Sequence, residues 1–383
     1  MHPLSVVMII ISYRLTFGVH FRIRQDYIMA RILIKNGRIW NGESFSYGDI
    51  FTSGNMVEKI AESIRTDADF ILDADGKIVT AGLVDMHVHM RGTAPSEFGI
   101  QAEMSCFPFG VTAANDAGSI CGNEELLTQF ALKNTVFVGC AIKDNHAALS
   151  ALESLLERYG KRAVGIKVYL DTTQADVRDQ TPLREVCEFA DIHQLKVMVH
   201  CTHSPVSVRQ IAETLRKGDI ITHAYHGGEN SSVADGFLGL MEAQRKGVIV
   251  DTGFAGHVHT DFQVFTSAVQ AGILPDTIST DITRYSAYIR GGRYGMTMCM
   301  SIAHTAGMQE EEILRAVTSR PAKVLGKEKE WGYLKEGRAA DIAVLDFGKE
   351  SYDLTDSAGN RMADEMGYRC VFTVVDGQIV YRD

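Results

Sequence analysis

Short apolar runs alternate with longer amphipathic stretches through the middle of this chain. The apolar runs are rich in β-branched residues and predict strands, whereas the stretches between them have the apolar spacing of helices. Pro182 suits the start of one helix, and Gly218 suits the end of another. We expect strands at 84–89, 112–116, 136–141, 165–169, 197–200, 220–223, 248–251 and 278–281, and helices at 147–158, 182–193, 207–217 and 233–246.

The order of these elements predicts the fold class. Eight strands that alternate with helices over ~240 residues are typical of a (β/α)8 TIM barrel, an α/β fold. A doubly wound open sheet is the competing architecture for the same alternation. We expect the barrel to occupy residues 81–337.

Both ends of the chain show the period-two alternation that is typical of strands. It covers about 30–78 and about 340–383, where an Asp-Gly turn at Asp376–Gly377 closes a hairpin. Neither region is long enough to form a good core alone. We therefore expect 29–80 and 338–383 to pair into one small β-sandwich domain.

Residues 1–28 do not share this pattern. Their apolar stretch at 6–11 is short, no Lys or Arg precedes it, and no clear small-residue cleavage site follows it. These features are poor for a secretory signal. We expect the natural start to be Met29 and the leader to lie outside the fold, with a loosely packed arm as the alternative.

Composition narrows the class of protein. Apolar residues make up 45% and charged residues 22% of the 383 residues, which is ordinary for a globular protein. The net charge of −10 argues against a nucleic-acid binder. No apolar run reaches the ~18 residues that a membrane-spanning helix needs. The seven cysteines are odd in number and scattered, which predicts reduced thiols and a cytoplasmic location.

Potential metal ligands stand where several of the predicted strands end. His87 and His89 are two residues apart on one strand, so both point to the same face and can clasp one ion. His200 ends the fifth strand, His223 the sixth and Asp281 the eighth. Because the carboxyl ends of barrel strands meet at one face, we expect these side chains to converge. Hydrogen-bonded core histidines, and a helix-capping role for Asp281, are the alternatives.

Lys167 is unusual within a buried apolar strand. Burial of an unpaired ammonium costs several kcal/mol, so the amine must lose its charge or find a partner. A neutral amine reacts with carbon dioxide to form a carbamate, an anion that can bridge two cations. Alternatively, Lys167 reaches out to solvent or pairs with Asp171.

The combined donor set contains imidazole nitrogen and oxygen but no thiolate. Such a set suits zinc or another divalent transition metal in a catalytic site with an open position. Two ions ~3.5–4 Å apart could share a hydroxide and polarise a substrate carbonyl. His203 and His226 follow the strand histidines by three residues each, and we interpret them as loop residues that contact substrate or support the site.

The order HxH, Lys, His, His, Asp resembles the binuclear subtype of the amidohydrolase superfamily, which includes dihydroorotases, hydantoinases and certain deacetylases. The resemblance covers nearly the whole chain from Met29. "GKIVTAGLVDMHVHMRG" resembles the family's entry into the first barrel strand, and "TSRPAKVLG" followed by "GYLKEGRAADIAVLD" resembles its exit into the terminal β-domain. "GVTAANDAGS" at 110–119 and "KGDIITHAYHGG" at 217–228 are similar to the deacetylase-like branch.

This resemblance implies a division of roles. His87, His89 and Asp281 would hold the more buried ion, and His200 and His223 the second, with carbamylated Lys167 bridging the two. A hydroxide between the ions would attack the substrate carbonyl, and Asp281 would carry its proton to the leaving nitrogen. The activity implied is hydrolysis of a C–N bond in a small carboxylate-bearing cyclic amide or N-acyl compound. The two divalent ions are expected to be Zn²⁺.

The chain departs from the family pattern in its substrate loops. Dihydroorotases carry Arg-Glu-Pro-Gly after HxH, whereas this chain keeps only the arginine, Arg91, which could bind a substrate carboxylate. The deacetylase-like branch tends to end its seventh strand in Gly-His-Gly, but here Phe254 replaces that histidine, with His257 and His259 shortly after. The glycine-rich segment 290–295 resembles a substrate loop in which Arg290 or Arg293 would meet an anionic group.

The sequence is also compatible with other functions. An ester-cleaving deacetylase would use the same site, and dihydroorotase proper is weakened by the missing Glu-Pro-Gly. A mononuclear deaminase lacks the bridging lysine, which Lys167 argues against. A non-catalytic scaffold would have lost ligands, whereas every expected ligand type is present. We expect a small-molecule substrate, no nucleic-acid or membrane partner, and a barrel that is compatible with a homo-oligomer.

Overall fold

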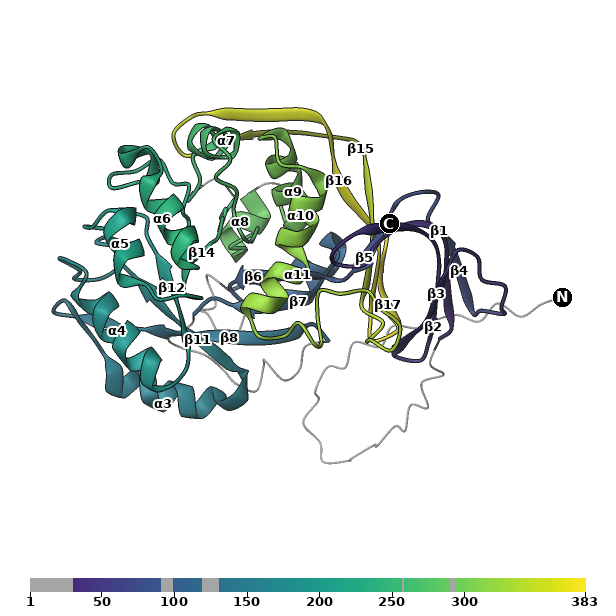
Figure 1. The fold of residues 1–383 in the computed structure, drawn as a ribbon, viewed down its shortest axis with the longest axis horizontal. Helices are drawn as coiled ribbons and strands as arrows, with labels where there is room; N and C mark the ends of the chain where they lie inside the picture. Colours follow the sequence, from purple (N-terminus) through teal and green to yellow (C-terminus); the bar gives the residue numbers. More distant parts are fainter. Residues whose placement is uncertain (1–29, 91–98, 119–130, 257, 290–293) are drawn as a thin grey trace, which may run out of the picture.

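The computed structural model describes residues 30–90, 99–118, 131–256, 258–289 and 294–383. The leader 1–28 therefore lies outside the described residues. Two sheets organise the rest of the chain: a curled parallel sheet of seven strands and a second sheet of eight strands (Figure 1).

The parallel sheet is the predicted barrel. Its strands follow the chain order and are β6 (Leu83–Val88), β7 (Val111–Asp116), β8 (Lys133–Cys140), β11 (Ala163–Tyr169), β12 (Lys196–His200), β13 (Ile220–Thr222) and β14 (Ile249–Val250). A small hairpin, β9 (Ile142–Lys143) and β10 (His146–Ala147), follows β8. The seven parallel strands are mainly apolar because both faces of their sheet are buried. The polar side chains among them, such as Lys167 of β11, are buried as well.

The eighth predicted strand, 278–281, is not a regular strand, but the same segment closes the ring. Thr277 forms an isolated bridge to Asp251, and Ile282 forms one to Val88. The Asp281 N–H donates to the His87 carbonyl at 2.7 Å. Asp281 has a φ of 48°, which lies outside the β region and interrupts strand geometry.

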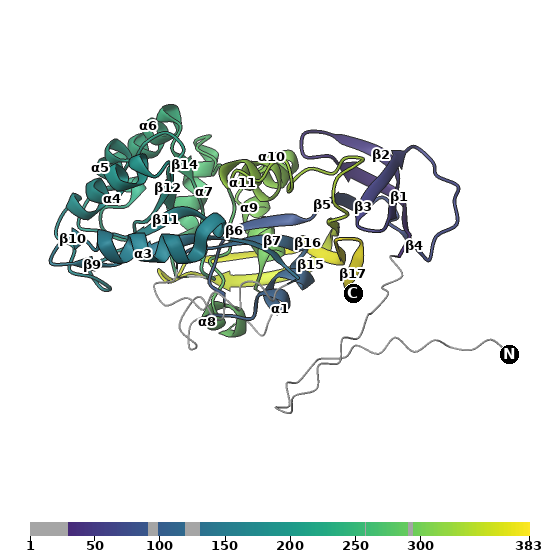
Figure 2. The ribbon, with the colours of Figure 1, turned by 90° about the horizontal axis from the view of Figure 1, so that it is seen from below.

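Helices cover the outside of the parallel strands (Figures 1 and 2). The predicted helix at 233–246 is broken, because Gly236 and Phe237 have φ of 65° and 67°. Gly218 lies in a turn beyond its helix, which already ends at Thr214. The helices are α1 (Ala102–Cys106), α3 (Leu149–Tyr159), α4 (Thr181–Ile192), α5 (Val208–Thr214), α6 (Leu238–Lys246), α7 (Phe262–Gln270), α8 (Arg284–Ile289), α9 (Met296–Thr305), α10 (Glu310–Val317) and α11 (Ser319–Val324). The short 3-10 helices are η1 (Phe107–Phe109), η2 (Gly160–Arg162) and η3 (Ser232–Asp235).

The second sheet joins both ends of the chain, as the alternation predicted. Strand β5 pairs parallel to β1 and antiparallel to β15, so it links the N-terminal strands to the C-terminal ones. All eight strands form one hydrogen-bonded sheet around a shared apolar core, rather than two separate sheets. They are β1 (Ile32–Trp40), β2 (Phe45–Ser53), β3 (Met56–Ala61), β4 (Phe70–Asp73), β5 (Ile78–Ala81), β15 (Ile342–Thr355), β16 (Arg361–Val375) and β17 (Gln378–Arg382).

The long hairpin of β15 and β16 leaves this sheet and extends along the barrel to α7 (Figure 1). At its tip, the Asp356 carboxylate accepts a hydrogen bond from the Phe262 N–H at 2.8 Å. Asn360 donates to Asp261, which caps the N-terminus of α7. The C-terminal part of the chain therefore supports a loop at the barrel mouth.

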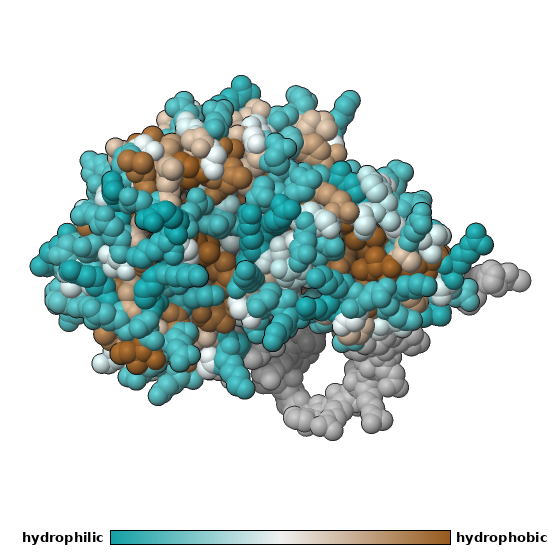
Figure 3. Space-filling model, viewed as in Figure 1, coloured by the Kyte–Doolittle hydropathy of each residue, from teal (hydrophilic) through white to brown (hydrophobic). Residues whose placement is uncertain are grey.

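Figure 3 shows one face on which hydrophilic residues predominate and apolar residues form small groups. Within the described ranges, no helix combines the length and the apolar character that crossing a membrane requires.

Candidate active site

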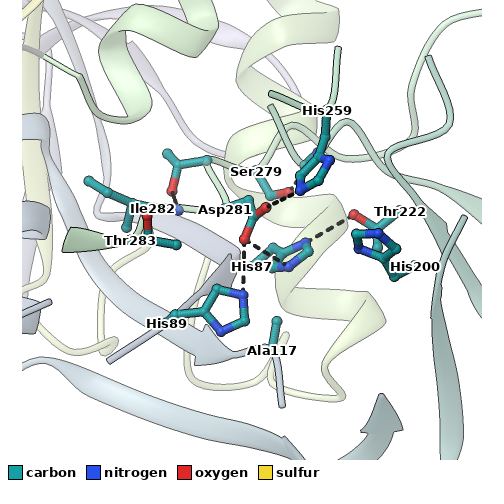
Figure 4. Close-up of polar contacts among 12 residues, drawn as sticks. His87, His89, Ala117, His200, Thr222, His259, Ser279, Asp281, Ile282 and Thr283 are labelled. Carbon is teal, nitrogen blue, oxygen red and sulfur yellow. Dashed lines mark hydrogen bonds and ion pairs between the residues drawn. The ribbon is translucent and has the colours of Figure 1, made fainter. Parts of the chain in front are cut away.

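Three of the predicted ligands meet at the carboxyl end of β6. The Nε2 atoms of His87 and His89 lie 3.2 Å and 3.0 Å from Oδ1 of Asp281 (Figure 4). His87 is the penultimate residue of β6 and His89 follows the strand, so their side chains share one face. Asp281 comes from the segment that closes the ring, and all three side chains are buried.

A second group of three histidines adjoins the first. His200 ends β12, His223 follows β13, and His259 lies in the loop before α7. Their ring centroids lie 4.6 Å (His200–His223), 4.9 Å (His200–His259) and 4.3 Å (His223–His259) apart. The His87 and His223 rings, 5.1 Å apart, link the two groups.

Lys167 lies against the first group. Its Nζ atom is 3.1 Å from His87 Nε2, and the residue is 0% exposed. The alternative of a solvent-directed lysine is wrong, because Lys167 is fully buried. The alternative of a pair with Asp171 is also wrong, because the Asp171 carboxylate instead contacts His200 at 3.3 Å and His203 at 3.8 Å. Among the described residues, no carboxylate lies within ion-pair distance of Lys167.

Hydrogen-bond partners indicate which nitrogen of each histidine is available. His223 Nδ1 lies 2.7 Å from the Gly253 carbonyl, which can only accept, so Nδ1 carries the proton and Nε2 keeps its lone pair. His200 Nε2 faces the Asp171 carboxylate, which likewise assigns the lone pair to Nδ1. Figure 4 shows His87 Nδ1 directed to the Thr222 hydroxyl, 2.9 Å away.

Two of the predicted ligands have an unusual backbone conformation, which determines the direction of their side chains. His223 and Asp281 have φ of 63° and 48°, a conformation that non-glycine residues rarely adopt and that often marks functional sites. Two glycines leave room for the site. A Cβ at Gly253 would lie 2.5 Å from His223 Nδ1, and one at Gly118 would lie 2.5 Å from the Lys167 Cβ.

Burial and neighbouring charges together set the protonation states of the site. Burial lowers the pKa of His200 to about 4 and that of His259 to about 3, so both are neutral near pH 7. Burial also lowers the pKa of the Lys167 amine to about 8. For Asp281, burial raises the pKa, but His87 and His89 outweigh it and hold the pKa well below its usual range.

A cavity of about 230 Å³ lies beside the second group. His226, a predicted substrate contact, lines it and is 3% exposed. The Gly228 N–H donates to His226 Nδ1 at 3.2 Å, so the ring proton is on Nε2, which has no hydrogen-bond partner among the described residues. The hairpin tip contributes Ser357 and Ala358 to the same wall.

The structure tests some sequence predictions and leaves others untouched. It brings together the six predicted ligands, but Arg91, Arg290 and Arg293 lie outside the described residues. The sequence predicts no role for His259 or for the hairpin tip. The two histidines after Phe254 were the available signal for His259, whereas no pattern pointed to Ser357 and Ala358.

The chemistry of these residues fits divalent metal ions. Each group offers three ligand atoms that all lie within 4.8 Å of one another: His87, His89 and Asp281 in one group, and His200, His223 and His259 in the other. Neutral imidazole and an ionised carboxylate are ligands that zinc prefers, and a buried amine beside them can supply a bridging anion after carbamylation. The residues present could therefore hold two ions.

Comparisons with known proteins match one family model and several named relatives. The model of the amidohydrolase family matches residues 78–380. The chain is 29% identical to a deacetylase of Enterococcus faecalis over 91% of its own length and 98% of that protein. It is 23% identical to a dihydroorotase of Bacillus cereus over 91% of its length and 98% of that protein.

Solved structures show the same fold. A dihydroorotase structure superposes with a TM-score of 0.81 and 23% identity, covering 92% of this chain and 99% of the other. An adenine deaminase structure gives a TM-score of 0.80 and 24% identity with the same coverage. The predicted TIM barrel with a β-domain from both chain ends is thereby confirmed.

Proposed function

Because the chain belongs to the amidohydrolase family, whose members are hydrolases acting on C–N bonds, we propose that it cleaves the amide bond of a small carboxylate-bearing N-acyl compound or cyclic amide. Two observations carry this proposal. Two groups of potential metal ligands adjoin each other, and the buried amine of Lys167 lies 3.1 Å from His87 of the first group. Such an arrangement suits water attack on a polarised carbonyl.

His87, His89 and Asp281 would hold one ion and His200 and His223 the other, with a carbamate on Lys167 between them. When bound, two divalent ions, which we propose to be Zn²⁺, would polarise the carbonyl and lower the pKa of the attacking water. Lys167 is suited to carbamylation because a pKa of about 8 leaves part of the amine neutral near pH 7.

Asp281 would act as the proton carrier. Its Oδ1 faces His87 and His89, and its Oδ2 lies 3.9 Å from His223 Nε2 and 4.0 Å from His259 Nε2. The depressed pKa keeps the carboxylate ionised, which is the form that can accept a proton from the attacking water. The same carboxyl group would then give that proton to the leaving nitrogen.

The cavity beside His259 would receive the uncharged part of the substrate. Its described lining contains neither Lys nor Arg, and the short side chains of Ser357 and Ala358 leave room for a small acyl group. The unpartnered Nε2–H of His226 would donate to a carbonyl or hydroxyl oxygen. Arg91, Arg290 or Arg293 would bind the substrate carboxylate.

A second candidate is cleavage of an ester by the same site. Two relatives named deacetylase are 29% and 28% identical to the chain, compared with 23% for the dihydroorotase of Bacillus cereus. This ranking, and the missing Glu-Pro-Gly after Arg91, favours linear acyl substrates over dihydroorotate.

We also propose a cytoplasmic location, because six free, buried cysteines form no disulfide among the described residues.

The test is hydrolysis by protein that has been reconstituted with zinc and bicarbonate. One substrate set contains N-acetyl amino acids and acetylated α-hydroxy acids, and the other contains dihydroorotate and hydantoins. We expect turnover of linear acyl compounds and its loss in Asp281→Asn. Absence of turnover on both sets, with two ions bound, would contradict the proposed substrate class.

A further inference from the structure

A buried hydrogen-bond cluster lies behind His87, on the side away from Asp281. Its centre is Asp251, which follows β14 and is 0% exposed. Oδ2 of Asp251 accepts hydrogen bonds from Thr222 Oγ1 at 2.8 Å and Ser279 Oγ at 2.7 Å, and Oδ1 accepts one from Thr277 Oγ1 at 2.7 Å. The cluster thus joins β13, the end of β14 and the closing segment.

Thr222 connects this cluster to His87. A hydroxyl has one proton, and Thr222 gives it to Asp251. The Thr222 oxygen can therefore only accept from His87 Nδ1, which lies 2.9 Å away. With an ion on Nε2, the proton of a neutral His87 is therefore on Nδ1. The lone pair is then on Nε2, which lies 3.2 Å from Oδ1 of Asp281, a proposed ligand of the same ion, and 3.1 Å from Lys167 Nζ.

We propose that Asp251 and Thr222 are positioning residues that fix the Nδ1–H tautomer of His87 and so raise the affinity of the first ligand group for a divalent ion. This inference rests on the proposed function, since it assumes that His87 binds metal through Nε2. The effect of the Asp251 carboxylate is indirect, because it orients the Thr222 hydroxyl and would not contact the ion. Partners of this kind orient metal-binding histidines in other proteins.

The competing explanation is that Asp251 only ties barrel segments together. The chain offers a matched control for that explanation, because Thr277 donates to the same carboxylate but, among the described residues, has no hydrogen bond to a histidine. Thr222→Val and Thr277→Val each remove one hydroxyl from Asp251 with little change of shape. Only Thr222→Val also removes the acceptor of His87 Nδ1.

The experiment measures the affinity of each variant for Zn²⁺ by competition with a chromophoric chelator, without substrate. We expect Thr222→Val to weaken one of two ions ~10–100-fold, the usual effect of losing such a partner. Thr277→Val should bind both ions as the wild type does, and Thr222→Ser, which restores a hydroxyl, should recover the affinity. Thermal unfolding of the metal-free variants checks that each is folded.

Equal weakening by Thr222→Val and Thr277→Val, or no weakening by Thr222→Val, would overturn the inference. Failure of the proposed function would look different, because it would appear in the wild-type protein as an absence of tight Zn²⁺ binding. If Thr222→Val does not fold, Thr222→Ala and Thr277→Ala provide the same comparison with less steric demand.

Discussion

The two ligand groups differ in what holds them in place. His87 and His89 belong to one strand and its direct continuation, are 1% and 4% exposed, and share the carboxylate of Asp281. The second group includes His259, which comes from a loop and has a side chain that is 17% exposed. A ligand that a strand positions is held more precisely than one that depends on a loop, such as His259. We therefore expect the first group to bind its ion more tightly and the second group to face substrate.

The largest effect is expected where the two groups meet. Lys167→Ala should remove most of the bound metal and lower kcat/KM by ~10³-fold or more, because several kcal/mol of metal-dependent stabilisation would be lost. Metal content by mass spectrometry and hydrolysis rates provide the measurement. Lys133→Ala, on the neighbouring strand β8, is the control, since Lys133 pairs with Asp341 away from the site. Two ions retained in Lys167→Ala would refute the carbamate bridge.

Substitutions in the two ligand groups should have smaller effects on metal binding, and these effects should differ between the groups. His87→Asn should lose the tightly bound ion. His259→Asn should keep it and weaken only the second ion, by ~10-fold, because the His259 ring adjoins those of His200 and His223. Titration of metal-free protein with Co²⁺, followed by its visible absorption, distinguishes the two steps. The comparison fails if both variants lose the same ion to the same extent.

The pH dependence of stability should also reflect the buried histidines. His200 and His259 have pKa values of about 4 and about 3 in the folded protein, below the ordinary value of 6.5. As the pH falls below about 6.5, the unfolded state binds protons that the folded state does not, so the metal-free protein should lose stability down to about pH 4. His259→Asn should show a shallower loss in urea unfolding at a series of pH values. An equally steep loss in the variant would contradict this interpretation.

The hairpin tip should give the smallest effect and leave both ligand groups intact. Ala358→Leu would narrow the cavity beside His259, so KM should rise for longer acyl groups while an acetyl group is still accepted. Ala363→Leu, on β16 outside that cavity, is the matched control. Steady-state kinetics over a series of acyl lengths provides the measurement, and equal effects of the two substitutions would remove the tip from the substrate site.

The same contrast explains which features the sequence could predict. The pair of His87 and His89 could be predicted because side chains two residues apart on a strand point to the same face of the sheet. Lys167 could be predicted as a site residue because burial of an unpaired ammonium within an apolar strand is costly. The alternation of apolar runs likewise predicted seven of the eight barrel strands.

The features that were missed depend on backbone paths rather than on spacing. The closing segment loses strand geometry because Asp281 adopts a positive φ, which no local pattern announces. His259 and the hairpin tip reach the site through a loop and a hairpin separated by about a hundred residues, joined by the bond from the Phe262 N–H to Asp356. Long-range contacts of this kind cannot be inferred from one sequence without its folded structure.

The central claim is that two adjoining groups bind two ions with Lys167 between them. Crystals of protein reconstituted with zinc and bicarbonate, measured at the zinc absorption edge, test it most directly. We predict two anomalous peaks, one among His87, His89 and Asp281 and one beside His200 and His223, with extra density on Lys167. A single peak, or an unmodified Lys167 between two peaks, would contradict the account.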